Sequence, residues 1–208
     1  MKKVILQEFV SLDGFAADSK GGVDFVPAAS KGDQSFGRRQ LEFMDTVDTI
    51  LLGRVTYEMF AGYWPNVTSG DDKEFADRIN AMRKIVFSST LEKAPWGAWL
   101  EGRIVRGPAE EAVPRLKHDP GKNMVLWGSI SLAQSLLRSG LVDELQLIVC
   151  PTALGSGKRL IAEELEPGAV SLAAVHSFDR GNVLLSYEVS SAVSAGHVES
   201  RQYIGARH

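Results

Sequence analysis

Gly53-Arg54-Val55-Thr56-Tyr57-Glu58 follows the apolar run Thr49-Ile50-Leu51-Leu52, and these two segments decide the fold class. The apolar run is typical of a buried strand, and the residues after it form a helical pattern. A glycine, a cation and a hydroxyl therefore lie where a strand turns into a helix. Free backbone N–H groups and the helix dipole favour an anion at such a turn. We expect Arg54 and Thr56 to contact a phosphate; the alternative is an arginine that is solvated beside a helix N-terminus.

Strands and helices alternate along most of the chain. The predicted strands are Val4 to Val10, Thr49 to Leu52, Lys84 to Ser88, Arg103 to Arg106, Asn123 to Trp127 and Glu144 to Cys150. The predicted helices are Phe36 to Met44, a segment from Arg54, Lys73 to Met82, Ala109 to Lys117 and Ser131 to Arg138. Ser11 to Asp33, rich in Gly and Asp, is expected to be a long loop. This alternation favours parallel strands joined by helical crossovers, and so an α/β fold.

The C-terminal part departs from this alternation. Val170 to Phe178 and Val183 to Val189 flank Asp179-Arg180-Gly181-Asn182, a pattern typical of an antiparallel hairpin. No linker interrupts the chain before this hairpin. We therefore predict one domain over residues 1–189 and a polar tail over residues 190–208.

Composition excludes several classes of protein. A chain of 208 residues suits one domain with a sizeable core. The formal charge of −3 leaves no basic stripe for nucleic acid. No run is long and apolar enough to span a membrane, and no signal peptide is evident, so we expect a cytoplasmic protein. The single cysteine, Cys150, cannot form an intrachain disulfide, and the histidines show no metal-binding spacing, so we expect no metal.

Four strand ends carry groups that suit an anionic ligand. Besides Gly53 to Thr56, they are Ser88-Ser89-Thr90, Arg106-Gly107 and Trp127-Gly128-Ser129-Ile130. Taken singly, each of these is better explained as a turn, a helix cap or a solvated charge. In an open α/β sheet, however, ligands bind at the carboxyl ends of the strands. Four such ends together favour a long ligand with two phosphate regions, such as a dinucleotide.

These motifs occur in the order found in a known superfold. Ser11-Leu12-Asp13-Gly14-Phe15-Ala16, Gly53-Arg54-Val55-Thr56, Val86-Phe87-Ser88-Ser89, Gly128-Ser129 and Val142-Asp143-Glu144-Leu145 carry the match, which runs from about Lys3 to Val189. The chain resembles the dihydrofolate reductase superfold. It resembles more closely the reductase domain of the bifunctional riboflavin-biosynthesis deaminase-reductase and its stand-alone relatives. The resemblance implies a three-layer α/β fold, with a mostly parallel mixed sheet, a C-terminal antiparallel hairpin and helices on both faces.

The resemblance implies an NADPH-dependent reductase. The main chain near Phe9 and Ala16 would bind the nicotinamide carboxamide, and backbone N–H groups at Gly128, Ser129 and Ile130 would meet the pyrophosphate. The remaining implied cofactor residues are Gly53, Arg54, Thr56 and Trp127, near the phosphates, and Ser88, Ser89 and Arg106, around the adenosine 2′-phosphate. The cofactor itself would carry the chemistry, and the protein would hold the nicotinamide face-on to the acceptor.

Three departures distinguish the chain from a true dihydrofolate reductase. The acidic residue that holds the pterin in that family falls near Gly37, where this chain has no carboxylate. Ile148 stands at the position of the pterin-side threonine, and Leu132 at that of a tyrosine. The resemblance covers the reductase domain alone, without a zinc-binding deaminase domain. We therefore expect poor activity on dihydrofolate.

The substrate side is expected to take residues from several elements. Strand alternation places Gln7 and Phe9 on one face, where Gln7 is either a substrate contact or an edge residue. The other pocket candidates are Asp24 from the long loop, Phe36 and Gln40 from the following helix, and Tyr57, an aromatic that is otherwise expected in the core. The expected substrate is a small pyrimidinone-like or pterin-like heterocycle or a carbonyl compound. The alternative is a non-catalytic NADP-binding module. In either case we expect a homodimer, to which the tail contributes.

Overall fold

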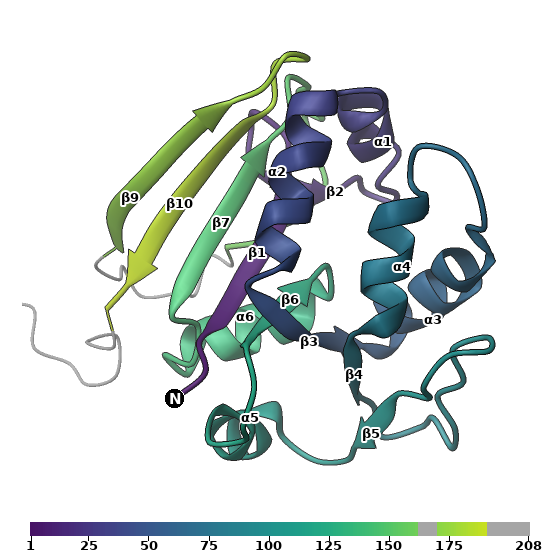
Figure 1. Ribbon diagram of the computed structural model, residues 1–208. Helices are drawn as coiled ribbons and strands as arrows, with labels where there is room; N and C mark the ends of the chain where they lie inside the picture. Colours follow the sequence, from purple (N-terminus) through teal and green to yellow (C-terminus); the bar gives the residue numbers. More distant parts are fainter. Residues whose placement is uncertain (162–169, 191–208) are drawn as a thin grey trace, which may run out of the picture.

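The computed structural model describes residues 1–161 and 170–190 (Figure 1). The predicted tail therefore lies outside the described residues, apart from Ser190. None of the described helices is long and apolar enough to cross a membrane.

A central sheet of eight strands organises the molecule (Figure 1). The strands lie in the order β5-β4-β3-β6-β1-β7-β10-β9. Every pairing from β5 to β7 is parallel, whereas β10 runs antiparallel to both β7 and β9. The bounds are β1 Val4–Val10, β3 Val47–Gly53, β4 Arg83–Phe87, β5 Arg103–Val105, β6 Asn123–Trp127, β7 Glu144–Val149, β9 Val170–Ser177 and β10 Val183–Val189. The predicted mixed sheet with a C-terminal antiparallel hairpin is confirmed.

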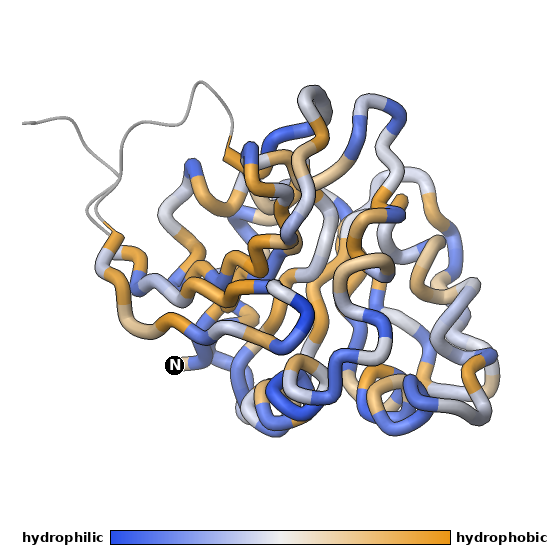
Figure 2. Tube along the Cα trace, turned by 90° about the horizontal axis from the view of Figure 1, so that it is seen from above, coloured by the Kyte–Doolittle hydropathy of each residue, from blue (hydrophilic) through white to orange (hydrophobic). Residues whose placement is uncertain are grey.

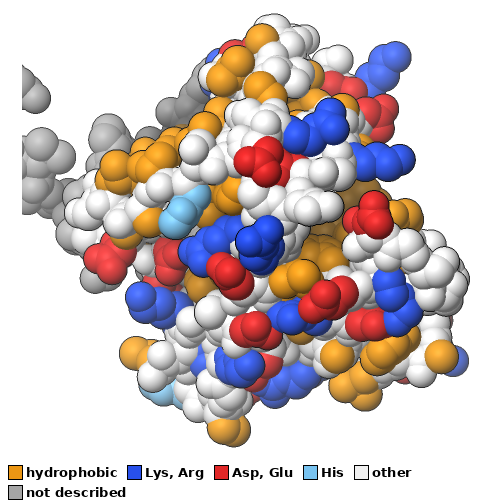
Figure 3. All heavy atoms as spheres, turned by 45° about the horizontal axis from the view of Figure 1, so that its top comes forward, with side chains coloured by type: hydrophobic (Ala, Val, Ile, Leu, Met, Phe, Trp, Pro, Cys, Tyr) orange, Lys and Arg blue, Asp and Glu red, His pale blue; other side chains and the backbone are white. Residues whose placement is uncertain are grey.

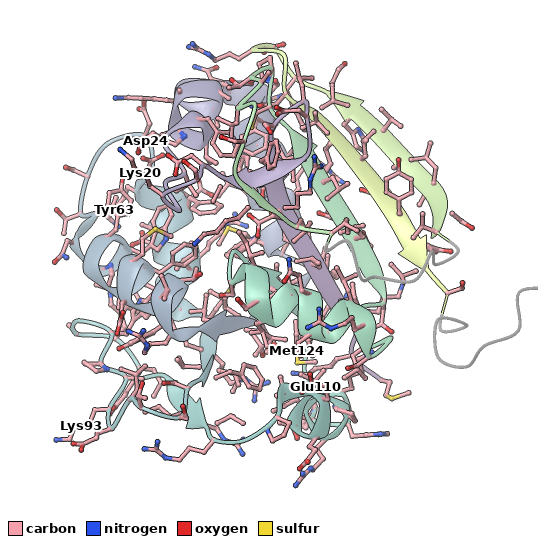
Figure 4. The ribbon with its side chains drawn as sticks, turned by 180° about the vertical axis from the view of Figure 1, so that it is seen from behind. Lys20, Asp24, Tyr63, Lys93, Glu110 and Met124 are labelled. Carbon is pink, nitrogen blue, oxygen red and sulfur yellow. The ribbon has the colours of Figure 1, made fainter. Side chains whose placement is uncertain are left out.

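Helices cover both faces of the sheet, and each face has its own core. The side chains of Ile5 and other residues on one face pack with helices α2 Gln34–Met44, α3 Arg54–Tyr63 and α4 Lys73–Ala81. Val4 and Leu6 on the other face pack with α5 Ala109–Lys117 and α6 Ile130–Arg138. Figure 1 shows α2 in front of the sheet, and Figure 4 shows α6 from behind. In Figure 2 the hydrophobic stretches run through the middle of the molecule and hydrophilic stretches lie around them. The central strands β1, β3, β4 and β6 are therefore buried from both sides, as their near-continuous apolar runs predict, whereas the edge strand β9 is largely exposed.

The segment predicted as a long loop contains two short elements. Phe15–Ala17 forms β2, which pairs antiparallel with β8, Lys158–Arg159. Phe25–Ser30 forms α1, whose Phe25 and Ala29 side chains are buried. The expectation of an unbroken loop over Ser11 to Asp33 is therefore wrong. Elements this short depend on a distant partner or on one buried ring, and neither leaves a periodic signal in the sequence.

Candidate cofactor and substrate site

The carboxyl ends of β3 and β6 form one interlocked turn. The two strands are neighbours, and both lead directly into helices, α3 and α6. The Ser129 N–H donates to Thr56 Oγ1 at 2.8 Å, and the Gly53 N–H donates to Ser129 Oγ at 2.8 Å. The Thr56 hydroxyl thus holds the backbone of Ser129, and the Ser129 hydroxyl holds the backbone of Gly53. The sheet brings together two motifs that lie more than seventy residues apart in the chain.

Gly128 allows this turn to close. Its φ is 55°, in the left-handed region, and Ser129 follows at φ 57°. A Cβ at Gly128 would lie 3.0 Å from Thr56 Cγ2. Only glycine fits without displacing the buried threonine. The turn therefore carries backbone strain and close approach at the N-terminus of α6, a combination that is common at ligand sites.

Exposed cations lie on the same edge of the sheet. The Arg54 guanidinium donates to both carboxylate oxygens of Glu58 at 3.0 Å, one helical turn away. Arg106 donates to the carbonyls of Ser89, at 3.1 Å, and Leu91, at 2.8 Å. An exposed ion pair of this kind contributes little stability, so Arg54 can exchange Glu58 for a phosphate at small cost.

The hydroxyl cluster after β4 holds its own turn. Ser88 Oγ accepts from the backbone N–H groups of Thr90, at 3.2 Å, and Leu91, at 3.1 Å. Ser89 is exposed, and its carbonyl accepts the bond from Arg106. Ser88 thus has a structural role in this loop, and its predicted contact with the adenosine end stays a prediction.

Gln7 is the centre of a buried polar chain across three strands. The indole N–H of Trp127 donates to Gln7 Oε1 at 2.8 Å, and Gln7 Nε2 donates to Gln146 Oε1 at 2.7 Å. Gln146 in turn donates to Glu144 Oε1 at 2.7 Å. Because β1 lies between β6 and β7, the alternative that Gln7 is an edge residue is wrong. The substrate contact of Gln7 stays a prediction, although these hydrogen bonds already engage both polar atoms of its amide.

An aromatic wall stands beside the same face of β1. The rings of Phe9 and Phe36 meet edge-on, with centroids 5.7 Å apart, and Phe36 meets Phe178 at 5.2 Å. Gln40, one helical turn after Phe36, is buried, and its Nε2 has no hydrogen-bond partner among the described residues. An unpaired buried amide is costly and calls for an explanation, such as a ligand or a water. Phe9, Phe36 and Gln40 thus form the part of the predicted substrate side that the fold places together.

Two other substrate candidates lie apart from this wall. Tyr57 is buried against Trp96, and its hydroxyl donates to the Pro95 carbonyl at 2.7 Å, so it belongs to the core. Asp24 is exposed at the start of α1. Figure 4 shows Asp24, Lys20 and Tyr63 on one flank of the molecule. Tyr63 lines a cavity of about 330 Å³ together with the end of α1 and the loop before α4.

Asp13 fixes the loop that follows β1. Its carboxylate accepts from the Ser11 hydroxyl at 2.6 Å and from the N–H groups of Leu154, at 3.1 Å, and Gly155, at 2.6 Å. The bond from Ser11, with these backbone donors, lowers the pKa of Asp13 to about 2. The carboxylate ties this loop to the chain after β7. Asp13 thus acts as a cap for this turn, a role that is common for aspartate in loops.

The sequence interpretation missed Glu8. This residue lies on the face of β1 opposite Gln7, between Leu6 and Val10, and only 8% of it is exposed. Burial raises the pKa of Glu8 to about 8, although hydrogen bonding to the backbone of Phe9 and Gly128 opposes the rise. A signal was present: strand alternation places a carboxylate among apolar side chains on a strand that is buried on both faces. A buried carboxyl with a raised pKa is a common feature of functional sites.

No metal site is evident among the described residues, where no group of three or more His, Cys, Asp or Glu side chains could hold an ion.

A second cavity, of about 120 Å³, lies at the amino ends of the parallel strands and is lined by Lys2, Lys84 and Met124 among others. The predicted cofactor residues lie at the opposite ends of these strands. In Figure 4, Met124 lies low in the view and Tyr63 lies high.

Comparison with known proteins identifies the family. The model of the RibD C-terminal domain matches residues 2–185. The chain belongs to the RibD C-terminal domain family. It is 31% identical to YyaP of Bacillus subtilis (strain 168) over 188 residues, which are 89% of this chain and 94% of YyaP. Membership of this family supports a reductase-type function.

Solved structures confirm the fold. A putative riboflavin biosynthesis protein from Shewanella sp. PV-4 is similar with a TM-score of 0.69 and 21% identity, covering 91% of this chain and 99% of that one. A dihydrofolate reductase from Enterococcus faecalis, complexed with NADP(H), has a TM-score of 0.54 and 12% identity, with 90% and 96% covered. The chain therefore has the dihydrofolate reductase-like fold that the sequence resemblance implies.

Proposed function

We propose that this protein is an NADPH-dependent reductase that transfers a hydride to a small heterocycle, pyrimidinone-like or pterin-like, or to a carbonyl compound. The interlocked turn at Gly53 to Thr56 and Gly128 to Ser129 carries the proposal. It presents the N-terminus of α6 at the carboxyl edge of a parallel sheet, where such folds bind the phosphates of dinucleotides. A dihydrofolate reductase of the same fold was solved with NADP(H).

The residues at this edge fit the cofactor. The absence of a Cβ at Gly128 lets Thr56 pack against the turn that opens α6, and exposed Arg54 and Arg106 supply positive charge for phosphates. The main chain of Phe9 and Ala16 would hold the carboxamide. NADPH supplies the hydride when it is bound, and the protein orients the ring and excludes water.

The substrate side favours a small planar compound. Phe9 and Phe36 would stack or pack against a ring, and Gln40 Nε2, which has no partner among the described residues, could donate to a carbonyl oxygen. Gly37 lies on the same helix, and apart from its chain neighbours and the helix backbone no described residue lies within 4 Å of the position its Cβ would take, so no described carboxylate stands at that position. We therefore expect dihydrofolate to be a poor substrate and methotrexate to bind weakly.

The test is NADPH oxidation with a panel of pterins, pyrimidinones and small carbonyl compounds, run beside a calorimetric titration with NADPH. Turnover of one class with NADPH supports the reductase. Cofactor binding without turnover of any compound favours the non-catalytic NADP-binding module. Failure of NADPH to bind contradicts both.

We further propose that the protein is a homodimer. Val170, Leu172 and Val175 are exposed on the edge strand β9, and Figure 3 shows hydrophobic side chains gathered along this flank. An apolar edge strand whose outer side pairs with no strand among the described residues invites pairing with another chain. Light scattering of the full chain, and of a version that ends at Ser190, would show whether a dimer forms and whether it needs the residues beyond.

A further inference from the structure

The backbone of Phe9 faces a gap in the sheet. The Lys3 carbonyl accepts from Met124 of β6, whereas the carbonyls of Val4 and Val10 accept from residues that bracket β7. Odd-numbered residues of β1 therefore direct their backbone groups toward β6. Pairing with β6 ends at Gln7 and Trp127, although pairing with β7 continues to Val10. Along the side of β1 that faces β6, the Phe9 N–H is thus the first N–H group that has no carbonyl of a paired strand to donate to.

The side-chain carboxyl group of Glu8 accepts a hydrogen bond from this N–H. The Phe9 N–H donates to Glu8 Oε1 at 3.2 Å. The Gly128 N–H lies close enough to lower the pKa of the same carboxyl. The other oxygen, Oε2, is buried and has no hydrogen-bond partner among the described residues. A buried carboxyl thus occupies the N–H group that the nicotinamide carboxamide would need.

No neighbouring charge among the described residues explains the raised pKa of Glu8. Burial is the largest cause of its raised pKa, and no charged side chain among the described residues contributes to the shift. The charged groups on the surrounding elements have other contacts or lie exposed at the surface. Glu144 of β7 accepts from Gln146, Glu110 of α5 accepts from Ser135, Arg138 is exposed near Glu110, Arg159 of β8 stacks on Phe15, and Lys158 is exposed.

We propose that Glu8 is a positioning residue that couples cofactor binding to the uptake of one proton. This inference rests on the proposed function. When the nicotinamide carboxamide binds the Phe9 N–H and a phosphate approaches Gly128, an ionised Glu8 would lose its hydrogen bond from Phe9 and meet another negative charge. The cofactor therefore binds the protonated form, whose O–H can donate to the carboxamide oxygen. Ionised Glu8 holds the site closed to the cofactor.

The test is the dissociation constant of NADPH as a function of pH for the parent, for Glu8→Gln and for Glu188→Gln, an exposed carboxylate on β10. Glutamine mimics the protonated acid and cannot titrate. For the parent and the Glu188 variant, the dissociation constant should rise about tenfold for each pH unit above the pKa of Glu8. For Glu8→Gln it should stay nearly constant over the same range. Equal pH slopes in all three proteins would overturn the inference but leave the proposed function intact.

A second measurement uses the parent alone. Infrared difference spectra recorded above the pKa of Glu8 should show a protonated carboxyl band that appears when NADPH binds. Calorimetry in two buffers of different ionisation enthalpy should show proton uptake under the same conditions. Binding without the band and without proton uptake overturns the inference, even if the Glu8 variant does not fold. Absence of NADPH binding at every pH overturns the proposed function and this inference together.

Discussion

Gln7 and Glu8 are adjacent on β1, and their side chains lie on opposite faces of the sheet and differ in how completely they are hydrogen-bonded. On the α2 face, Gln7 is the middle of a chain from Trp127 to Glu144 in which each bond is 2.7–2.8 Å long. On the α6 face, Glu8 is equally buried, but one of its oxygens has no partner among the described residues. A completed polar network stabilises and specifies a core, whereas an incomplete one costs free energy. We infer that the hydrogen-bond chain through Gln7 has a structural role and that the Glu8 carboxyl has a functional one.

The largest expected effect comes from Glu8→Gln. Because the pKa of Glu8 rises from 4.5 to about 8 on folding, the parent loses stability as the pH rises through this interval. The loss is about 1.4 kcal/mol for each pH unit, so that Glu8→Gln should be more stable than the parent by about 3–5 kcal/mol above the upper limit. Near the lower limit both proteins should be equally stable. Urea unfolding across this pH range measures the difference; a difference that does not change with pH would show that Glu8 is not buried as a carboxylate.

Gln7→Leu should have the opposite sign. It leaves the Trp127 N–H and the Gln146 carbonyl oxygen buried without partners, and the free energy of unfolding should fall by about 2–4 kcal/mol. The loss should not depend on pH between about 5 and 9, since no group in the exchange titrates there. Gln34→Leu, at an exposed position of α2, is the matched control. A loss at Gln7 no larger than in this control would mean that the polar chain does not stabilise the sheet.

These two residues also show what the sequence could and could not predict. Long strands and helices, the parallel core and the C-terminal hairpin follow from apolar periodicity. From the sequence, Thr56 and Ser129 could be placed at the same edge of the sheet, but the hydrogen bond between them could not be predicted. Partners such as Gln146 for Gln7 depend on register, which periodicity does not give. The role of Glu8 depends on where β6 leaves β1, and this is a property of the turn at Gly128.

The smallest expected effect extends the comparison to an exposed charge. Arg106→Ala should narrow the preference for NADPH over NADH by about 1–3 kcal/mol, the loss of one charge-assisted bond to the 2′-phosphate. Stability should change little, because Arg106 is exposed. Arg103→Ala, an exposed arginine at the other end of β5, is the control and should leave the preference unchanged. Titration with both cofactors measures the effect, and an unchanged preference in the Arg106 variant would place the 2′-phosphate elsewhere.

The most direct test of the account is a crystal structure of the protein grown with NADPH at a pH below the pKa of Glu8. The account predicts the pyrophosphate against the backbone N–H groups of Gly128 to Ile130, and the nicotinamide carboxamide on the main chain of Phe9 and Ala16. It also predicts that the Glu8 carboxyl no longer accepts the Phe9 N–H. A cofactor bound at the amino ends of the strands, or bound at the turn while Glu8 keeps that bond, would contradict it.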